Sequence, residues 1–458
     1  MLRRFRSRSK QKKVLVLGLD CVGYDLLFNT LLDDLPHLKS IIEHSSWGIL
    51  ESCIPCITVP AWSVMMSGAD PGELGVYGFR NRKSYRYDEL FVADANAIQK
   101  ERVWDATSRL GLNNIVLSVP QTYPVSPLKG KLVSGFLSPN TSAAFTYPAI
   151  LKQDILKEMP QYQFDVRPFR TENKNQLLQS IYDFNEQQFR LVIKMMESQQ
   201  DWQFFMHVNM ATDRLHHGFW RYHDPEHRLY QSNNPFQHAI RDFYKSLDYL
   251  IGEILKRLDD HTALMIVSDH GVKRMDGAIC INEWLRLKGW LHLKNPIKEG
   301  EVIPFDLENV DWSKTRAWST GGYYGRIFLN VAGREPEGII APEALASVKQ
   351  ELSEALEQIC DDQDQPLATQ VFYPEEIYRD VQRIAPDLMV YFGDLHWRTV
   401  GGLGYGQHFC FENDTGPDDA NHAMEGIYIF YDPQSSTSGK GETLPISHIK
   451  SRILAQFK

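Results

Sequence analysis

The sequence has no apolar run long enough to cross a membrane. A spanning helix needs about 20 consecutive apolar residues, whereas the longest clean apolar segments, such as Val14–Leu17 and Ala263–Val267, have the length of strands. Cysteine is also scarce, with 6 residues in a chain of 458. Disulfide-stapled secreted domains are far richer in cysteine, and no two Cys pairs stand at the spacing of a structural zinc site. These absences predict a large, soluble globular protein.

The charge is low and unevenly distributed. The 58 acidic and 49 basic residues give a net charge of −9, yet residues 1–13 contain only basic charges. We expect these residues to form a disordered basic leader, and the rest of the chain to be too acidic to bind nucleic acid. The leader lacks the apolar centre of a secretory signal, so the expected location is the cytoplasm.

Short apolar runs alternate with helical patterns along the chain. This alternation predicts an α/β fold with a doubly wound, mostly parallel sheet. Residues 14–458 would form one catalytic domain, with insertions near 80–100, 138–175 and 290–325 forming a cap. The expected strands are Val14–Leu19, Asn114–Val119, Trp202–Val208, Thr262–Ser268, Tyr324–Val331, Asp387–Phe392 and Gly426–Tyr431, and the main helices are 31–44, Ala61–Ser67, Asn175–Gln199 and 235–258.

Metal-binding side chains follow two of the expected strands directly. Asp20 comes straight after Val14–Leu19, and Asp269 and His270 come straight after Thr262–Ser268. Open α/β sheets bind ligands at the carboxyl ends of their strands. A turn-capping role explains any one of these residues alone, but together they suggest a cation site.

A further set of ligand types lies near these strand ends. Asp213 and His217 are four residues apart, which places them on one helix face. His422 lies in an acidic loop before the last expected strand. The combined oxygen and nitrogen donors are enough for two cations, and they suit Zn²⁺ or Mn²⁺ better than Ca²⁺.

Thr58 stands before an expected apolar helix. A threonine there commonly caps the helix. The same position also places its hydroxyl beside free backbone N–H groups that attract phosphate, and a neighbouring cation would make it a nucleophile.

These motifs, in this order, resemble the alkaline phosphatase superfamily, and most closely its type I phosphodiesterase/nucleotide pyrophosphatase branch. Within that branch they are similar to a group described as predicted phosphohydrolases or phosphomutases. The resemblance covers nearly the whole chain and implies an alkaline phosphatase-like fold. It is carried by Thr58-Val-Pro-Ala-Trp62, Met66-Ser-Gly-Ala-Asp-Pro-Gly72, Thr212-Asp-Arg-Leu-His-His-Gly-Phe-Trp220 and Asn330-Val-Ala-Gly-Arg-Glu-Pro-Glu-Gly338.

The resemblance implies a phosphoester hydrolase with two divalent metals, Zn²⁺ first and Mn²⁺ second, acting on a small phosphorylated substrate. Thr58 would attack phosphorus and form a phospho-threonine intermediate. The implied ligands are Asp213, His217 and His422 for one metal, and Asp20, Asp269, His270 and Thr58 for the other.

The chain departs from the family at one position. Nucleotide pyrophosphatases carry an Asn three residues after the nucleophile to hold a phosphate oxygen, and here that residue is Ala61. Either backbone N–H groups or a basic residue would replace it, with Arg80, Arg82 and Arg214 as the basic candidates, and His216 is a further candidate substrate contact. A sulfatase is excluded, because Ile57 stands where its motif requires Arg.

Two alternatives to a phosphodiesterase remain at this stage. The same residues would serve a phosphomonoesterase or a phosphomutase. An inactive relative used for binding is disfavoured, since no implied ligand or nucleophile is missing. The substrate and the oligomeric state are left open.

Overall fold

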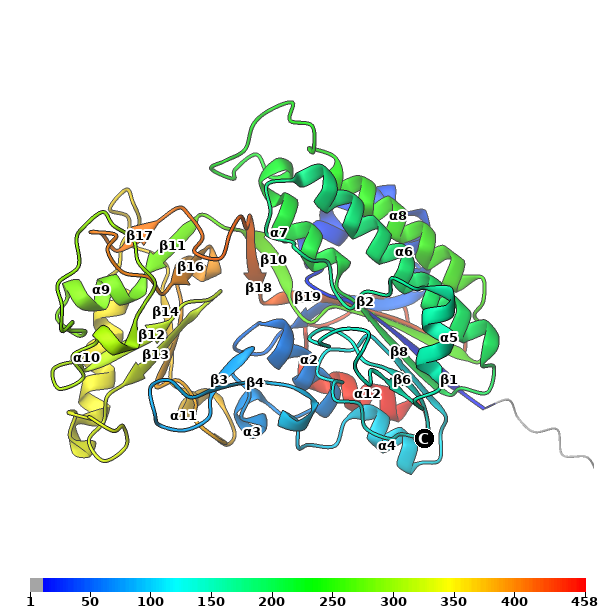
Figure 1. The fold of residues 1–458 in the computed structure, drawn as a ribbon. Helices are drawn as coiled ribbons and strands as arrows, with labels where there is room; N and C mark the ends of the chain where they lie inside the picture. Colours follow the sequence, from blue (N-terminus) through cyan, green and yellow to red (C-terminus); the bar gives the residue numbers. More distant parts are fainter. Residues whose placement is uncertain (1–10) are drawn as a thin grey trace, which may run out of the picture.

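The largest element of the computed structural model, which describes residues 11–458, is a ten-stranded sheet (Figure 1). The predicted leader lies outside the described residues as far as residue 10, and Lys13 already belongs to the first strand. The central strands β9, β1, β8, β5 and β6 are parallel, and antiparallel strands flank them on both sides. In sheet order the strands are β20 (Gly439–Lys440), β2 (Ser45–Glu51), β19 (Glu425–Tyr431), β9 (Thr262–Val267), β1 (Lys13–Leu19), β8 (Phe204–Asn209), β5 (Asn114–Leu117), β6 (Gly130–Val133) and β7 (Thr146–Tyr147), with β21 (Leu444–Pro445) beside β2.

Helices cover both faces of this sheet, so the predicted doubly wound, mostly parallel α/β fold is confirmed. The three central strands β1, β8 and β9 are buried almost throughout, as expected of apolar strands packed on both faces. One layer holds α1 (Pro36–Ile42), α6 (Lys174–Ser198), α7 (Ala211–His223) and α8 (Ala239–Leu255), and the other holds α2 (Thr58–Ser67), α3 (Pro71–Leu74), α4 (Val103–Arg109) and α12 (Ile449–Ala455); α5 (Leu151–Glu158) follows β7. None of the helices within residues 11–458 has the length and apolarity needed to span a bilayer.

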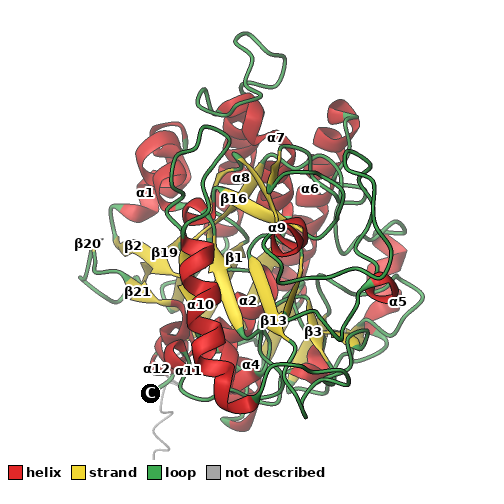
Figure 2. Ribbon diagram, turned by 90° about the vertical axis from the view of Figure 1, so that its left-hand side faces the viewer, coloured by secondary structure: helices red, strands yellow, loops and turns green. Residues whose placement is uncertain are grey.

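A smaller lobe with its own apolar core lies beside the large sheet (Figures 1 and 2). An antiparallel sheet and a three-stranded sheet form it, and α10 runs along its outer side (Figure 2). Its elements are β12 (Ala317–Thr320), β13 (Gly325–Leu329), β15 (Leu388–Tyr391) and β14 (Gln370–Phe372), then β16 (Trp397–Val400), β11 (Gly277–Cys280) and β17 (Phe409–Cys410), with α9 (Ile281–Leu287), α10 (Leu345–Glu357) and α11 (Pro374–Ile377).

Two of the expected strands lie in this lobe and not in the main sheet. We expected strands at Tyr324–Val331 and Asp387–Phe392. They contain β13 and β15, which pair antiparallel with each other in the smaller lobe. An apolar run with β-branched residues identifies a strand, but it carries no information about which strand it pairs with.

Two short ribbons lie between the lobes. The strands β10 (Gly271–Arg274) and β18 (Ala420–Ala423) pair antiparallel, and so do β3 (Arg80–Arg82) and β4 (Leu90–Val92). In Figure 1, β10 and β18 lie where the chain passes between the large sheet and the smaller lobe. The first ribbon therefore joins the carboxyl end of β9 to the region of His422.

Gly18 in β1 is required by close packing. A Cβ at this position would lie 2.4 Å from the ring of Trp62 in α2. Because Gly18 has none, the Trp62 ring packs directly on the strand and its Nε1 donates a 2.6 Å hydrogen bond to Asp20 Oδ2. Strand β1 and helix α2 together thus hold the side chain of Asp20 in position.

His207 in β8 makes folding sensitive to acid. In the sheet His207 pairs with Leu17 of β1 on one side and with Leu117 of β5 on the other. Burial lowers the pKa of His207 to about 3. An unfolded His has a pKa of about 6.5, so below that pH the unfolded chain takes up a proton that the folded chain does not. The contribution of His207 to the free energy of unfolding is therefore fully present above about pH 6.5. It falls by up to about 1.4 kcal/mol per pH unit as the pH drops toward 3.

We predict that His207→Leu makes the free energy of unfolding decline less steeply than that of the wild type between pH 7 and 5. Urea denaturation at several pH values measures this slope. The control is His44→Gln, because His44 is exposed. An unchanged slope in His207→Leu would show that His207 is not the acid-sensitive group.

Candidate active site

The candidate site lies where three neighbouring strands end. Asp20 follows β1, Asp213 is in the first turn of α7 after β8, and Asp269 and His270 follow β9. The strands β8 and β9 both pair in parallel with β1, so their carboxyl ends meet at one edge. His422 reaches this edge from β18.

The first cluster consists of Asp213, His217 and His422. The Nε2 atom of His217 lies 3.2 Å from Asp213 Oδ1 and 3.2 Å from His422 Nε2, and the third side of the triangle is 3.8 Å. Ligand atoms held about 2.0–2.2 Å from a tetrahedral zinc ion are separated by roughly 3.3–3.6 Å. The three donor atoms therefore fit a zinc-sized cation.

The second cluster consists of Asp20, Asp269, His270 and Thr58. The Nε2 atom of His270 lies 3.3 Å from Asp269 Oδ2, 3.7 Å from Asp20 Oδ1 and 3.5 Å from Thr58 Oγ1. The rings of His270 and His422 stack at 3.9 Å between centroids, so the two clusters are adjacent. This spacing would suit a pair of cations acting on one substrate.

One oxygen of each aspartate points into these clusters without a hydrogen-bond partner among the described residues. The atoms are Asp20 Oδ1, Asp213 Oδ1 and Asp269 Oδ2, and all three side chains are buried. A buried carboxylate oxygen with no donor costs several kcal/mol. The other oxygen of each is satisfied, by Trp62, Arg214 and the backbone N–H of Cys21 respectively. The unsatisfied oxygens are thus the ones a cation would contact.

His217, His270 and His422 each have one ring nitrogen near a hydrogen-bond acceptor and the other facing a cluster, as metal-binding histidines do. Each Nδ1 lies near an acceptor, at 2.6 Å for His217 with Asp418, 2.8 Å for His422 with the carbonyl of Cys56, and 3.0 Å for His270 with the carbonyl of Gly271. An Nδ1–H that donates to an acceptor leaves the Nε2 lone pair free. All three Nε2 atoms are those that face the aspartates.

The electrostatics show uncompensated negative charge. Burial and the charge of Asp213 raise the pKa of Asp20 well above its ordinary value, and burial and Asp20 do the same to the pKa of Asp269. At His217, burial lowers the pKa, but Asp418 and Asp213 outweigh it and raise the pKa to about 9. Bound cations would relieve the repulsion between these carboxylates.

Thr58 does not cap its helix. The N-cap of α2 is Ile57, and Thr58 is already the first helical residue, so its side chain is free of the capping role. The hydroxyl faces His270 instead. The first turn of this ten-residue helix also presents backbone N–H groups and a partial positive charge at the same point.

The three arginines predicted to bind phosphate line the same cavity but differ in their ion pairs. Arg80, Arg82 and Arg214 all line one cavity beside Thr58. Arg214 is occupied by Asp165, at 2.7 Å, and by Asp213, while Arg82 is paired with Glu335 at 2.9 Å. Arg80 has an exposed side chain with no ion-pair partner in residues 11–458.

The structure places His216 away from the cavity, against our expectation. One helical position separates it from His217, which turns its side chain toward α8. Its ring lies between Tyr244, whose hydroxyl is 3.1 Å from Nε2, and Trp220. Burial lowers the pKa of His216 to about 3, as expected of a neutral packing residue.

Sequence reasoning missed several residues that touch the clusters. The thiol of Cys21 lies within 4.8 Å of the donor atoms of the first cluster. Asp418 binds His217, and Tyr323 donates to Asp418 at 2.8 Å. Arg170 also binds Asp418, at 3.0 Å. The positions of Cys21 beside Asp20, of Asp418 near His422 and of the aromatic Tyr323 near the motifs were signals, whereas nothing marked Arg170.

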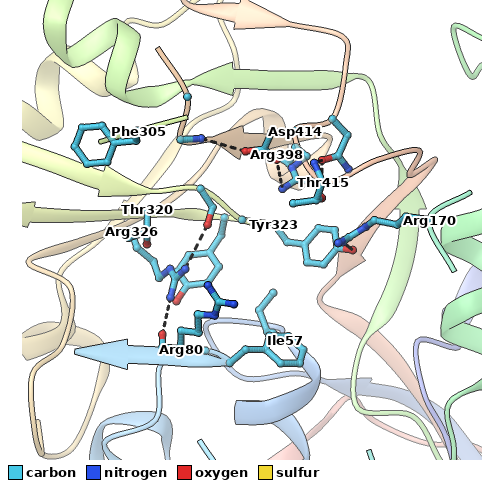
Figure 3. Close-up of a pocket in the computed structure, with 18 of the residues that line it drawn as sticks. Ile57, Arg80, Arg170, Phe305, Thr320, Tyr323, Arg326, Arg398, Asp414 and Thr415 are labelled. Carbon is cyan, nitrogen blue, oxygen red and sulfur yellow. Dashed lines mark hydrogen bonds and ion pairs between the residues drawn. The ribbon is translucent and has the colours of Figure 1, made fainter. Parts of the chain in front are cut away.

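The cavity beside the clusters has a volume of about 820 Å³ and lies between the two lobes (Figure 3). Each segment expected to form a cap contributes to its wall. Leu90 comes from the first, Phe169 and Arg170 from the second, and Val302–Phe305 from the third. The opening thus gives a ligand access to Thr58, Asp213, His217 and His422.

The chain matches a known protein family and resembles solved structures in its fold. The family model described as type I phosphodiesterase/nucleotide pyrophosphatase matches residues 14–418. Murine ectonucleotide pyrophosphatase/phosphodiesterase 5 has a similar structure (TM-score 0.56, 14% identity, covering 97% of this chain and 95% of that one), and so does its inactive variant in complex with AMP (TM-score 0.56, 14% identity, 98% and 95%). Phosphonoacetate hydrolase from Sinorhizobium meliloti 1021 in complex with phosphonoformate is also similar (TM-score 0.61, 14% identity, 98% and 96%). No curated protein sequence matches the chain significantly.

We predict that the two clusters bind metal separately. Asp213→Asn or His422→Ala should remove about one of two metal equivalents, and Asp269→Asn should remove the other, because each change deletes a donor from one cluster only. Elemental analysis of the purified variants measures this.

The matched control is His223→Gln, at the far end of the same helix as Asp213. It should retain the wild-type metal content, with circular dichroism confirming that every variant is folded. A wild-type metal content in both Asp213→Asn and His422→Ala would show that the ligand assignment is wrong.

Proposed function

The chain belongs to the type I phosphodiesterase/nucleotide pyrophosphatase family and is a hydrolase acting on phosphoester bonds, and we propose that Thr58 is its nucleophile and that two divalent metals are its cofactors. The observation that carries the proposal is the Thr58 hydroxyl, which does not cap its helix, lies 3.5 Å from His270 Nε2 and lines the open cavity. Zn²⁺ is the metal that the mixed Asp and His donors favour, with Mn²⁺ second.

The proposed ligands follow the two clusters. Asp213, His217 and His422 would hold one metal, and Asp20, Asp269, His270 and Thr58 the other, as the donor distances support. Bound metals would supply Lewis-acid charge that lowers the pKa of the attacking hydroxyl and stabilises the leaving oxygen. The Asp418 carboxylate orients the His217 ring, and Trp62 orients Asp20.

Thr58 would act in two displacements. Its Oγ1 attacks phosphorus in line, the bond to the leaving oxygen breaks, and a phospho-threonine forms. Water then breaks the new bond between phosphorus and Thr58 Oγ1 and releases the phosphoryl group. The N-terminus of α2 stabilises the negative phosphoryl oxygens during both steps, because its first N–H groups lie beside the hydroxyl.

The same site supports a second reaction, on phosphate monoesters. A monoester dianion carries more charge than a diester, and several arginines line the cavity: Arg80, Arg82, Arg170, Arg214, Arg326 and Arg398. A phosphomutase would use the same phospho-threonine and return it to a bound product. We place the phosphodiesterase first because the family match is to phosphodiesterases.

We predict that Thr58→Ala abolishes hydrolysis of bis-p-nitrophenyl phosphate and keeps its metal at one equivalent or more. The reason is that the attacking oxygen is lost while the other donors remain. Thr58→Ser is the matched control and should retain measurable turnover, since it keeps a hydroxyl. Full activity in Thr58→Ala would rule out the covalent route.

We also expect bis-p-nitrophenyl phosphate to be cleaved with a higher kcat/KM than p-nitrophenyl phosphate. Both release the same chromophore, so their rates are directly comparable in one absorbance assay, with a chelator-treated sample as the blank. Faster cleavage of the monoester would favour the phosphomonoesterase alternative.

A further inference from the structure

Four of the arginines that line the cavity are neutralised by acidic side chains. Arg82 pairs with Glu335 at 2.9 Å and Arg214 with Asp165 at 2.7 Å. The other two, Arg170 and Arg398, pair with Asp418 and Asp414 at 3.0 and 3.4 Å. Through these ion pairs, the four arginines stabilise the wall of the cavity and the four acidic side chains that they contact.

Arg80 and Arg326 differ from the other four. Neither has an acidic partner within residues 11–458. The guanidinium of Arg326 donates to two carbonyls, those of Arg80 at 2.7 Å and Gly321 at 3.3 Å, and its Cζ lies over the ring of Tyr324, 5.9 Å from the centroid. The two hydrogen bonds and the cation–π contact hold the guanidinium in position without neutralising it.

Both side chains extend into the same part of the cavity. Arg80 comes from β3 and Arg326 from β13, and the hydrogen bond between them brings the two strands together. Figure 3 shows the side chains of Arg80 and Arg326 close together on one side of the cavity, with Ile57 and the ring of Tyr323 to their right. Gly78 and Gly322 flank Arg326, where a Cβ would approach its nitrogens to 3.4 and 4.0 Å, so little side-chain bulk lies between Arg326 and the cavity.

Two guanidinium groups that line one cavity repel one another, and no ion pair with an acidic side chain among residues 11–458 offsets their charge. The whole protein has a net charge of −9, yet within residues 11–458 no acidic side chain forms an ion pair with either arginine. A guanidinium is a planar donor that binds carboxylate or phosphate oxygens in pairs. An anion in the cavity would therefore satisfy both residues.

We propose that Arg80 and Arg326 bind a second, non-reacting anionic group of the substrate, so that the enzyme prefers phosphoesters with a phosphate or carboxylate at the far end. The proposal rests on the function proposed above, because it takes Thr58 as the point where the ester is cleaved. The metal clusters select the reacting phosphoryl group, and the arginine pair selects the rest of the molecule.

The test uses p-nitrophenyl phosphodiesters that differ only at the end of a short alkyl arm: a methyl group, a trimethylammonium group, a carboxylate or a phosphate. Arms of several lengths cover the unknown distance to the arginine pair. We expect kcat/KM for the phosphate or carboxylate arm to exceed that for the methyl arm by about tenfold or more at the best length, as a charge-assisted bidentate contact gives. The trimethylammonium arm should be the poorest.

The variants are Arg80→Met and Arg326→Met, each expected to reduce the ratio of anionic-arm to methyl-arm kcat/KM to within about threefold of 1. Arg80→Lys keeps the charge and should retain part of the preference. The matched control is Arg86→Met, which lies in the same hairpin with a side chain 63% exposed and should leave the ratio unchanged.

The outcomes separate this proposal from the one it rests on. If the methyl-arm ester is cleaved but an anionic arm gives no advantage, or if both Arg→Met variants slow all arms equally, the second-anion proposal is wrong and the phosphoester hydrolase stands. If no arm is cleaved by the metal-loaded protein, the proposed function fails and this proposal fails with it.

Discussion

Three carboxylate oxygens, one each from Asp20, Asp213 and Asp269, are buried at one edge of the sheet without a donor among the described residues. A folded protein rarely tolerates this, because each such oxygen costs several kcal/mol. The surrounding groups reduce the cost only in part, since burial and mutual repulsion still raise the pKa of Asp20 and of Asp269. The clusters are therefore built to contain positive charge, which is the premise of the proposed chemistry.

The rest of the fold serves to place these oxygens. Parallel pairing of β8 and β9 with β1 brings three strand ends to one edge, and the absence of a side chain at Gly18 lets Trp62 reach Asp20. The α2 helix then starts at Thr58, with its positive end toward the same point. The smaller lobe closes the other side of the cavity and contributes Arg326 and Arg398 to its wall.

Much of this site is predictable from the sequence because it depends on local rules. Asp20 and Asp269 follow apolar strands, and Asp213 and His217 stand one helical turn apart, so their convergence follows from strand and helix geometry. The wrong expectation for His216 came from the same kind of local reasoning, since nothing in the sequence shows that the adjacent helix face is packed against Tyr244. Arg326 could not be found at all, because its contact with Arg80 joins residues 246 positions apart in two different sheets.

The central claim is that two metals occupy the two clusters, and anomalous diffraction tests it most directly. Crystals of the protein, purified without chelator, would be measured on both sides of the zinc and manganese absorption edges. The account predicts two anomalous peaks, one among Asp213, His217 and His422 and the other among Asp20, Asp269, His270 and Thr58. Crystals with no peak at either cluster, from a protein sample that cleaves phosphodiesters in the presence of chelator, would contradict it.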